Sequence, residues 1–264
     1  MQSKDSMVTD FAQQILNQIR SVVVGKDQVL LWVLAAILAR GHILLEDIPG
    51  VGKTTMALAF SKVLDLQYSR VQFTPDVLPS DVTGYTVLDQ KTGQMHYQSG
   101  AVLTNLFLAD ELNRATSRTQ SALLEAMEEG QVTVDGVSHP LPQPFVVIAT
   151  QNPTGAAGTS LLPDSQMDRF MVRLSLGYPS AKDEISMVLS RQEGNPLQKL
   201  TSLMTRSDLA KLQDSVAQTY MSDVVVSYLV KLISVTRSHE DILRGASPRA
   251  TLSATAMAKA VARL

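Results

Sequence analysis

The sequence predicts an α/β fold, in which a parallel sheet of five strands lies between helices and is followed by a smaller all-helical domain. Short apolar runs alternate with helical stretches from residue 42 up to residue 180. This alternation is typical of crossover units that cover a parallel sheet on both faces. After residue 180 only helical patterns continue, so we expect an α/β domain over residues 1–180 and a helical domain over residues 181–264.

Two helices precede the first predicted strand. Apolar residues at helical spacing predict one from Val8 to Ile19, which runs into the turn Val22 to Gly25. The second extends from about Asp27 to Arg40, and its apolar stretch is too short to span a bilayer, so it is better explained as a buried helix. The strands and helices of the α/β region are then expected at His42 to Glu46, Thr54 to Leu64, Tyr68 to Phe73, Leu106 to Asp110, Thr116 to Glu129 and Phe145 to Thr150.

The remaining elements are two hairpins, a fifth strand and four helices. One hairpin turns near Asp89 to Gly93, and the other turns at Asp135-Gly136, a pair that favours a tight turn. The fifth strand follows Asp168 to Phe170, and the later helices are expected near residues 181–192, 208–220, 222–238 and 248–264. The last helix has no stop signal, so we expect the helical domain to be incomplete at its C-terminus.

Composition and charge exclude several classes of protein. A hydrophobic content of 45% and a charged content of 18% are typical of a folded protein with a core. The net charge of -2 argues against a generally basic nucleic-acid binder. The chain has no cysteine, which excludes disulfides and thiolate metal sites, and it shows no signal-peptide pattern. We therefore expect a cytoplasmic protein that does not insert into membranes.

The clearest chemical signal is a phosphate-binding loop, residues 46–54, which follows a predicted strand and opens a predicted helix. Gly50 and Gly52 let the backbone wrap a phosphate, whose charge the helix dipole stabilises. Lys53 supplies a positive charge to the β- and γ-phosphates, and the Thr54 hydroxyl ligates Mg²⁺. The ATP-binding residues expected in this segment are Pro49, Gly50, Val51, Gly52, Lys53, Thr54 and Thr55.

Asp47 stands where this motif usually has its first glycine. Aspartate is one of the few residues that tolerate unusual backbone angles, and Pro49-Gly50 can still set the turn. A chance glycine turn before a helix is the alternative explanation. The Lys53-Thr54 pair, together with the flanking strand and helix, makes the phosphate loop the better one.

An acidic pair, Asp110 and Glu111, ends the apolar strand that begins at Leu106. On its own such a pair more often begins a solvated loop. In an alternating α/β region, however, strand ends are where the sheet presents its chemistry. Asp110 can hold Mg²⁺ through water, and Glu111 can polarise the water that attacks the γ-phosphate.

Three further polar residues are candidates for the same site. Asn152 follows the strand Phe145 to Thr150, where its amide could contact the γ-phosphate and fix the attacking water. An Asn-Pro pair that merely starts a turn is the alternative. Arg169 and Arg249 each offer a guanidinium, although single arginines are more often surface residues.

Taken together, these residues resemble the AAA+ superfamily and, within it, the MoxR family, over essentially the whole chain. Besides the phosphate loop, the resemblance is carried by the segments Gln72 to Asp76, Leu78 to Asp81, Ala109 to Ala115, Leu123 to Glu129 and Ala149 to Pro153. It implies a P-loop AAA+ core with a helical lid domain. It also implies ATPase activity with Mg²⁺.

The resemblance assigns roles to individual residues. It implies a sensor 1 role for Asn152, an arginine-finger role for Arg169 on the neighbour's ATP, and a sensor 2 role for Arg249 in its own subunit. The turn Val24-Gly25 resembles the adenine-contacting segment. Arg114 is a second candidate for the interface arginine. A finger that acts between subunits requires a ring, and we expect a hexamer.

The function implied is a MoxR-type ATPase that remodels, activates or matures client proteins, with von Willebrand A-domain proteins as expected associates. A nucleic-acid motor of the related helicase branch would need basic residues on the hairpins, which offer only Lys91, His96 and His139. A nucleotide switch without turnover is disfavoured by the acidic pair and the strand-end amide. A GTPase is suggested by Asp81 to Gly84, but the guanine signature Asn-Lys-x-Asp is absent.

Overall fold

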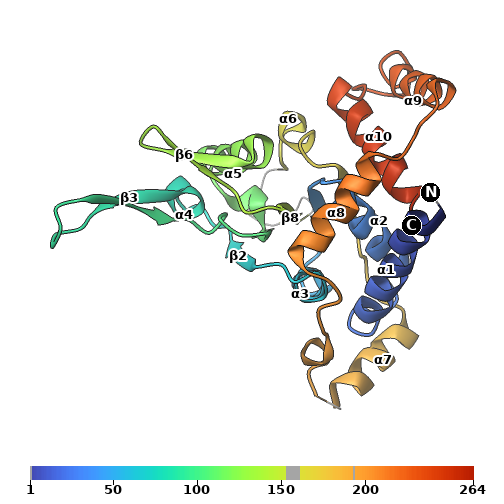
Figure 1. The fold of residues 1–264 in the computed structure, drawn as a ribbon, viewed down its shortest axis with the longest axis horizontal. Coiled ribbons are helices and arrows are strands. Elements are labelled where there is room, and N and C mark those ends of the chain that lie inside the picture. Colours follow the sequence, from blue (N-terminus) through green and yellow to red (C-terminus); the bar gives the residue numbers. More distant parts are fainter. Residues whose placement is uncertain (1, 153–160, 193) are drawn as a thin grey trace.

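The computed structural model describes residues 2–152, 161–192 and 194–264. Figure 1 shows an α/β body from which two hairpins project on one side, while most helices gather on the other. The predicted combination of a sheet with helical layers is confirmed. Pro153, the last residue of the segment that begins at Ala149, lies outside the described residues.

The central sheet has five parallel strands, as predicted, and their order is β2-β5-β8-β1-β9. The strands are β1 (Ile43–Glu46), β2 (Tyr68–Gln72), β5 (Leu106–Asp110), β8 (Val146–Gln151) and β9 (Val172–Leu174). Every residue of β5 and β8 is buried, because helices cover both faces of the sheet. All of these strands therefore end at the same edge, where the candidate residues follow them.

Helices pack against both faces of this sheet. One core contains side chains of α1 (Gln2–Arg20), α2 (Asp27–Leu38) and α3 (Lys53–Val63), together with Ile43 of β1. The next residue along β1, Leu44, belongs to the second core, which α5 (Ser117–Glu129) covers. Successive strand residues point to opposite faces, so a single short strand serves both cores.

The two hairpins turn where the sequence predicts. β3 (Gly84–Leu88) pairs with β4 (Met95–Ser99), and β6 (Gln131–Val134) pairs with β7 (Val137–Pro140). The short helix α4 (Pro79–Thr83) leads into the first hairpin. The rings of Tyr97 and His139 stack with their centroids 3.7 Å apart, at an interplanar angle of 12°. This contact joins one hairpin to the other.

The chain after β9 is helical, as predicted. The elements in the C-terminal part are α6 (Asp164–Met167), which precedes β9, and then α7 (Ala181–Gln192), η2 (Pro196–Lys199), α8 (Arg206–Ala217), α9 (Asp223–Val235) and α10 (Pro248–Val261). Leu209 of α8 and Met257 of α10 belong to the core that α1, α2 and α3 share. By contrast, α7 and α9 contain no buried residue. The domain division at residue 180 stays a prediction.

No helix in the described part of the chain combines the length and the apolar character that crossing a membrane requires.

Candidate functional site

The loop between β1 and α3 has the backbone of a phosphate cradle. Gly50 has a φ of +86° and Gly52 a φ of +98°, backbone conformations that residues other than glycine rarely adopt. A Cβ atom added at either glycine would meet no atom within 4 Å. Helix α3 begins at Lys53, so the amides of its first turn point toward this space. A phosphate group fits these features, because it needs close approach to backbone amides.

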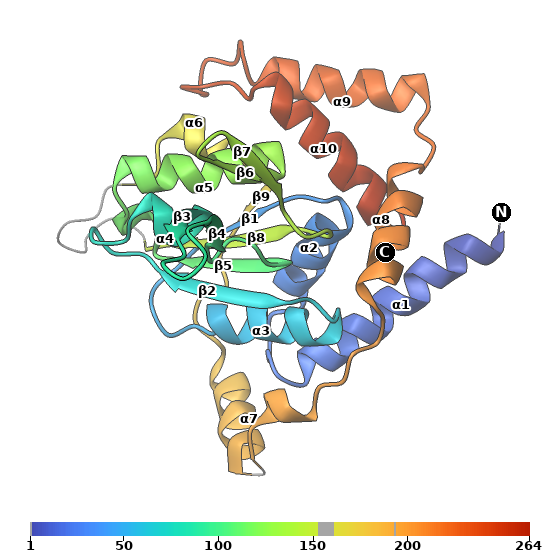
Figure 2. The same cartoon turned by 60° about the vertical axis from the view of Figure 1, so that its left-hand side comes forward.

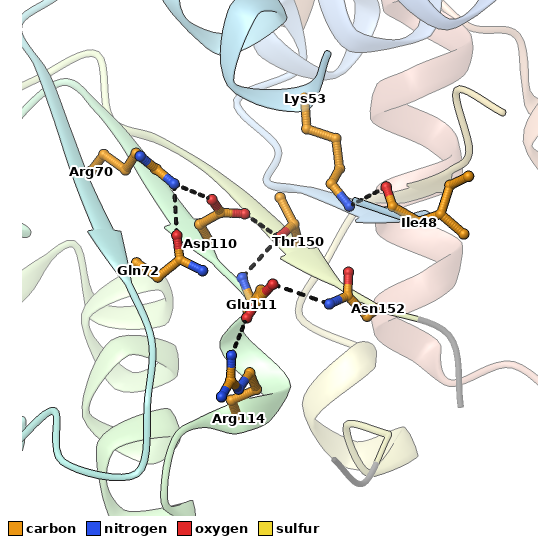
Figure 3. Close-up of polar contacts among 9 residues, drawn as sticks. All are labelled: Ile48, Lys53, Arg70, Gln72, Asp110, Glu111, Arg114, Thr150 and Asn152. Atoms are coloured by element: carbon orange, nitrogen blue, oxygen red, sulfur yellow. Dashed lines mark hydrogen bonds and ion pairs between the residues drawn. The ribbon is translucent and has the colours of Figure 1, made fainter. Parts of the chain in front are cut away.

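The Lys53 side chain lies against the loop itself (Figure 3). Its Nζ donates hydrogen bonds to the carbonyl oxygens of Asp47, at 2.7 Å, and Ile48, at 3.2 Å. Burial lowers the pKa of Lys53, whereas the nearby charges of Asp47, Asp110 and Glu111 raise it. Only β8 lies between β1 and β5 in the sheet. The cradle and the acidic pair are therefore at the same edge of the sheet.

Both carboxylate oxygens of Asp110 accept hydrogen bonds (Figure 3). The Arg70 guanidinium donates to Oδ2 at 2.7 Å, and the Thr150 hydroxyl donates to Oδ1 at 2.7 Å. Arg70 also donates to Gln72 Oε1 at 2.7 Å. Neither Arg70 nor Thr150 is among the predicted site residues. A hydroxyl at the end of the apolar strand β8 is the sequence signal for Thr150, whereas Arg70 lies on the edge strand β2 and has no such signal.

Glu111 has a left-handed backbone, with φ 56° and ψ 44°, and its carboxylate is held from two sides. Arg114 donates to Oε2 at 2.8 Å, and Asn152 donates to Oε1 at 3.1 Å. The hydrogen bond from Arg114 lowers the pKa of Glu111, with a further contribution from Asn152 and against the effect of burial. An ionised carboxylate beside a carboxamide can accept a proton from water and orient that water. The structure thus brings together the predicted residues Asp110, Glu111 and Asn152.

A cavity of about 600 Å³ adjoins the phosphate loop. Five of the predicted nucleotide-binding residues line it, namely Val24, Gly50, Val51, Gly52 and Thr55. The opposite wall comes from α7 and from the segment around η2, through side chains such as Met187, Arg191 and Leu197, which were not predicted. Gly25 lies beside the Asp183 side chain, and Pro49, Lys53 and Thr54 belong to the cradle without lining the cavity.

Arg169 and Arg249 lie elsewhere, where both contact the Glu128 carboxylate of α5. Arg169 Nε donates to one oxygen at 3.1 Å, and Arg249 pairs with the other. Figure 2 shows α10, which carries Arg249 near its start, on the opposite side of the sheet from α7. The helix is held there because it packs on α2 and α9. The structure therefore does not bring Arg249 to the phosphate loop of its own chain, as the expected sensor 2 role requires, and that role stays a prediction.

The segment that suggested a GTPase has a structural role. Asp81 lies in α4, where its carboxylate accepts a hydrogen bond of 2.8 Å from the Leu78 amide. A carboxylate that caps the first turn of a helix satisfies an otherwise unpaired amide. The motif therefore gives no support to guanine-nucleotide chemistry.

Comparisons with known proteins give a consistent result. Residues 42–172 match the family described as "ATPase family associated with various cellular activities (AAA)". The chain is 44% identical to the uncharacterized YeaC protein of Bacillus subtilis, over 94% of this chain and 78% of that one. It is 36% identical to Chaperone MoxR1 of Mycobacterium tuberculosis, over 95% and 68% of the two chains. A crystal structure of a Cytophaga hutchinsonii protein assigned as an ATPase has a TM-score of 0.90 at 34% identity, covering 99% of this chain and 82% of that one.

Proposed function

We propose that this chain, which belongs to the MoxR family of AAA+ ATPases, hydrolyses ATP with Mg²⁺ in a ring and thereby remodels, activates or matures partner proteins. Nucleotide binding and the ATPase class follow from the family. The metal, the roles of single residues, the ring and the clients are the proposal. The observation that supports it best is the phosphate cradle of α3 opposite Asp110 and Glu111 at one edge of the sheet.

The chain's own residues supply the parts that phosphoryl transfer to water requires. Lys53 exchanges two neutral carbonyl partners for phosphate oxygens, which form stronger, charge-assisted hydrogen bonds. Thr54 and Asp110 offer oxygen ligands of the kind that Mg²⁺ prefers. Bound Mg²⁺ supplies positive charge to the phosphates as the γ-phosphoryl group is transferred. Glu111 accepts a proton from the attacking water, and Asn152, which donates to Glu111, fixes the position of that water.

Arg169 is proposed to act on the ATP of a neighbouring subunit. Its guanidinium pairs with Glu128 and lies away from the cavity of its own chain. A guanidinium supplied by a neighbour stabilises the charge that develops during hydrolysis. Arg114 is the weaker candidate for this role, because its partner is Glu111, a residue of the site in its own chain.

Client proteins are proposed to contact the projecting hairpins. On the first hairpin Tyr85, Leu88 and Met95 are exposed at 50%, 54% and 63%, although apolar side chains are usually buried. The relative from Mycobacterium tuberculosis is named a chaperone, which supports a role in remodelling. From the family resemblance, von Willebrand A-domain proteins are the first clients to test.

The decisive experiment for ATP binding compares Lys53→Ala with Lys211→Ala. Lys211 is a suitable control, because it is exposed and pairs with Asp208 on the surface of α8. We expect Lys53→Ala to lose binding of a fluorescent ATP analogue in equilibrium titration, while the control binds like the wild type. Tight binding by Lys53→Ala would refute the phosphate-loop assignment.

The ring is tested by the ATPase rate per subunit at increasing protein concentration, with the mass measured in ATP. A site completed by a neighbour predicts a rate that rises with concentration together with the mass. A constant rate from a monomer would remove the subunit-interface part of the proposal and leave the ATPase assignment intact.

A further inference from the structure

The connector, residues 175–180, joins β9 to α7 and passes beside the phosphate loop. Three of its donors converge on one oxygen of Asp47. The Ser175 hydroxyl donates to Asp47 Oδ2 at 3.1 Å, the Gly177 amide donates at 2.9 Å, and the Leu176 amide donates the third hydrogen bond. Asp47 is only 6% exposed. The residue that replaces the usual first glycine of the phosphate loop is therefore a buried acceptor for the connector.

The backbone of Asp47 does not explain why an aspartate stands here. Among the described residues, the non-glycine positions with positive φ are Arg40, Asp65, Glu111 and Asp135, and Asp47 is not one of them. The sequence-based explanation, that aspartate tolerates unusual backbone angles, is therefore wrong for this position. The side chain is what the structure uses.

The connector is also attached to the turn on the other side of the cavity. Lys26 Nζ donates to the Tyr178 carbonyl at 2.9 Å. A Cβ atom added to Gly25 would lie 2.3 Å from the Asp183 carboxylate, so the start of α7 sits directly against this turn. Pro179 itself lines the cavity. The connector thus sets the distance between the phosphate loop and the wall formed by α7.

Helix α7 has no core of its own that could fix its position. None of its residues is buried, yet Met187, Ser190 and Arg191 on one side of it line the cavity. Figure 1 shows α7 apart from the other helices, at the end of the connector. Its placement over the cavity therefore depends on the segments at its two ends. The η2 end is held by Lys62 Nζ, which donates to the Leu197 carbonyl oxygen at 2.9 Å, and the connector end is held by the contacts to Asp47, which reach the phosphate loop.

We propose that Asp47 is a positioning residue for the nucleotide, whose carboxylate holds the connector so that α7 forms the nucleoside side of the cavity while the loop holds the phosphates. This inference rests on the proposed ATPase function. An oxygen acceptor at position 47 is required, because three donors converge on it and the Leu176 amide is buried, which leaves that amide no water to replace the carboxylate. Asp47 thus affects how tightly the nucleoside is bound, because the connector positions α7, whereas the loop binds the phosphates.

Three variants separate this role from others. Asp47→Gly restores the usual glycine of the motif but removes the acceptor. Asp47→Asn keeps an acceptor oxygen of similar reach and removes the negative charge. Ser175→Ala removes one donor from the exposed start of the connector and leaves the carboxylate in place. Each variant is first checked for an unchanged circular dichroism spectrum and a cooperative thermal transition.

The readout is affinity for two ligands, ATP and inorganic tripolyphosphate, measured by displacement of a fluorescent nucleotide. Tripolyphosphate probes the loop alone, because it has no nucleoside to contact α7. We expect Asp47→Gly to bind ATP about tenfold more weakly or worse and tripolyphosphate within about twofold of wild type. Asp47→Asn should bind ATP within about threefold of wild type, and Ser175→Ala should lose about twofold to fivefold.

Several results would overturn the inference while leaving the ATPase assignment in place. One is wild-type ATP affinity in Asp47→Gly, or an equal loss for both ligands, which would assign Asp47 to the loop itself. Another is an Asp47→Asn variant as weak as Asp47→Gly, which would show that the charge near Lys53 matters and the acceptor does not. If Asp47→Gly does not fold, the other two variants decide. Unchanged ATP affinity in Ser175→Ala, together with weaker ATP binding by Asp47→Asn, overturns the inference in the same way. Failure of the wild type to bind ATP would instead refute the proposed function.

Discussion

Acidification should destabilise the fold through His42, the residue that precedes β1. The Val147 amide donates to His42 Nδ1 at 3.0 Å, which leaves Nε2, 3.2 Å from the Met127 carbonyl oxygen, as the nitrogen that carries the proton. Both ring nitrogens are therefore used by the neutral form. A second proton on the ring would bind to Nδ1, which could then no longer accept the hydrogen bond from the Val147 amide. Burial lowers the pKa of His42 from its ordinary 6.5 to about 4, opposed in part by the hydrogen bond to Met127.

The size of the effect follows from this shift in pKa. Because the folded-state pKa lies below the unfolded one, the unfolded chain binds more protons between pH 6.5 and pH 4. The free energy of unfolding therefore falls as the pH drops through that window. One pKa unit corresponds to about 1.4 kcal/mol, so going from pH 7 to pH 5 should remove up to about 2 kcal/mol. Part of the His42 surface reaches solvent, which makes this figure an upper value.

Urea denaturation at pH 7 and pH 5, at constant ionic strength, measures this loss. His42→Gln should be less stable than the wild type at pH 7 but should lose much less stability on going to pH 5, because it has no proton to gain at this position. His96→Gln, which changes an exposed hairpin residue, should behave like the wild type and serves as the control. Equal losses in the wild type and His42→Gln would refute the reasoning.

Three further predictions concern the active site. Glu111→Gln should retain bound ATP while turnover falls by about a hundredfold or more, because an amide cannot accept the proton of water; rapid turnover in a phosphate-release assay would contradict this. Arg70→Gln should bind Mg²⁺ about threefold to tenfold more tightly in the ADP complex, because the substitution removes the guanidinium that competes with Mg²⁺ for the Asp110 carboxylate. Unchanged or weaker affinity in a Mg²⁺ titration would show that Arg70 does not compete. An equal mixture of Arg169→Ala and Lys53→Ala proteins should regain part of the ATPase activity, because some subunit contacts then combine both intact groups; no recovery would argue against action between subunits.

The elements that can be predicted from the sequence are those whose signal is local. The phosphate loop is recognisable because its residues are consecutive and its backbone needs glycine at positions 50 and 52. Helix α5 follows from an apolar stripe, a Thr116 cap and Gly130, which ends it with a φ of +64°. Strand β9 has only three residues, so its bounds carry almost no periodic signal and depend on pairing with β1.

The parts that cannot be predicted depend on contacts between distant segments. Nothing near Asp47 in the sequence indicates that its partners are residues 175–177. The position of Arg249 depends on where α10 packs, and the helices it packs on include α2, more than 200 residues earlier in the chain. The sequence pattern places Thr150 in a strand and gives Arg70 no role, because the importance of each lies in reaching Asp110 on a neighbouring strand.

The stacked rings of Tyr97 and His139 have a mechanical consequence. An isolated two-stranded ribbon is only marginally rigid, and this contact adds to the packing of β3 and α4 on β6 that already links the two hairpins. With the rings in face-to-face contact, a displacement of one ribbon is transmitted to the other. One ribbon is rooted at α4 and the other at the end of α5, so a pull on either tip is shared between two anchoring points in the body of the protein.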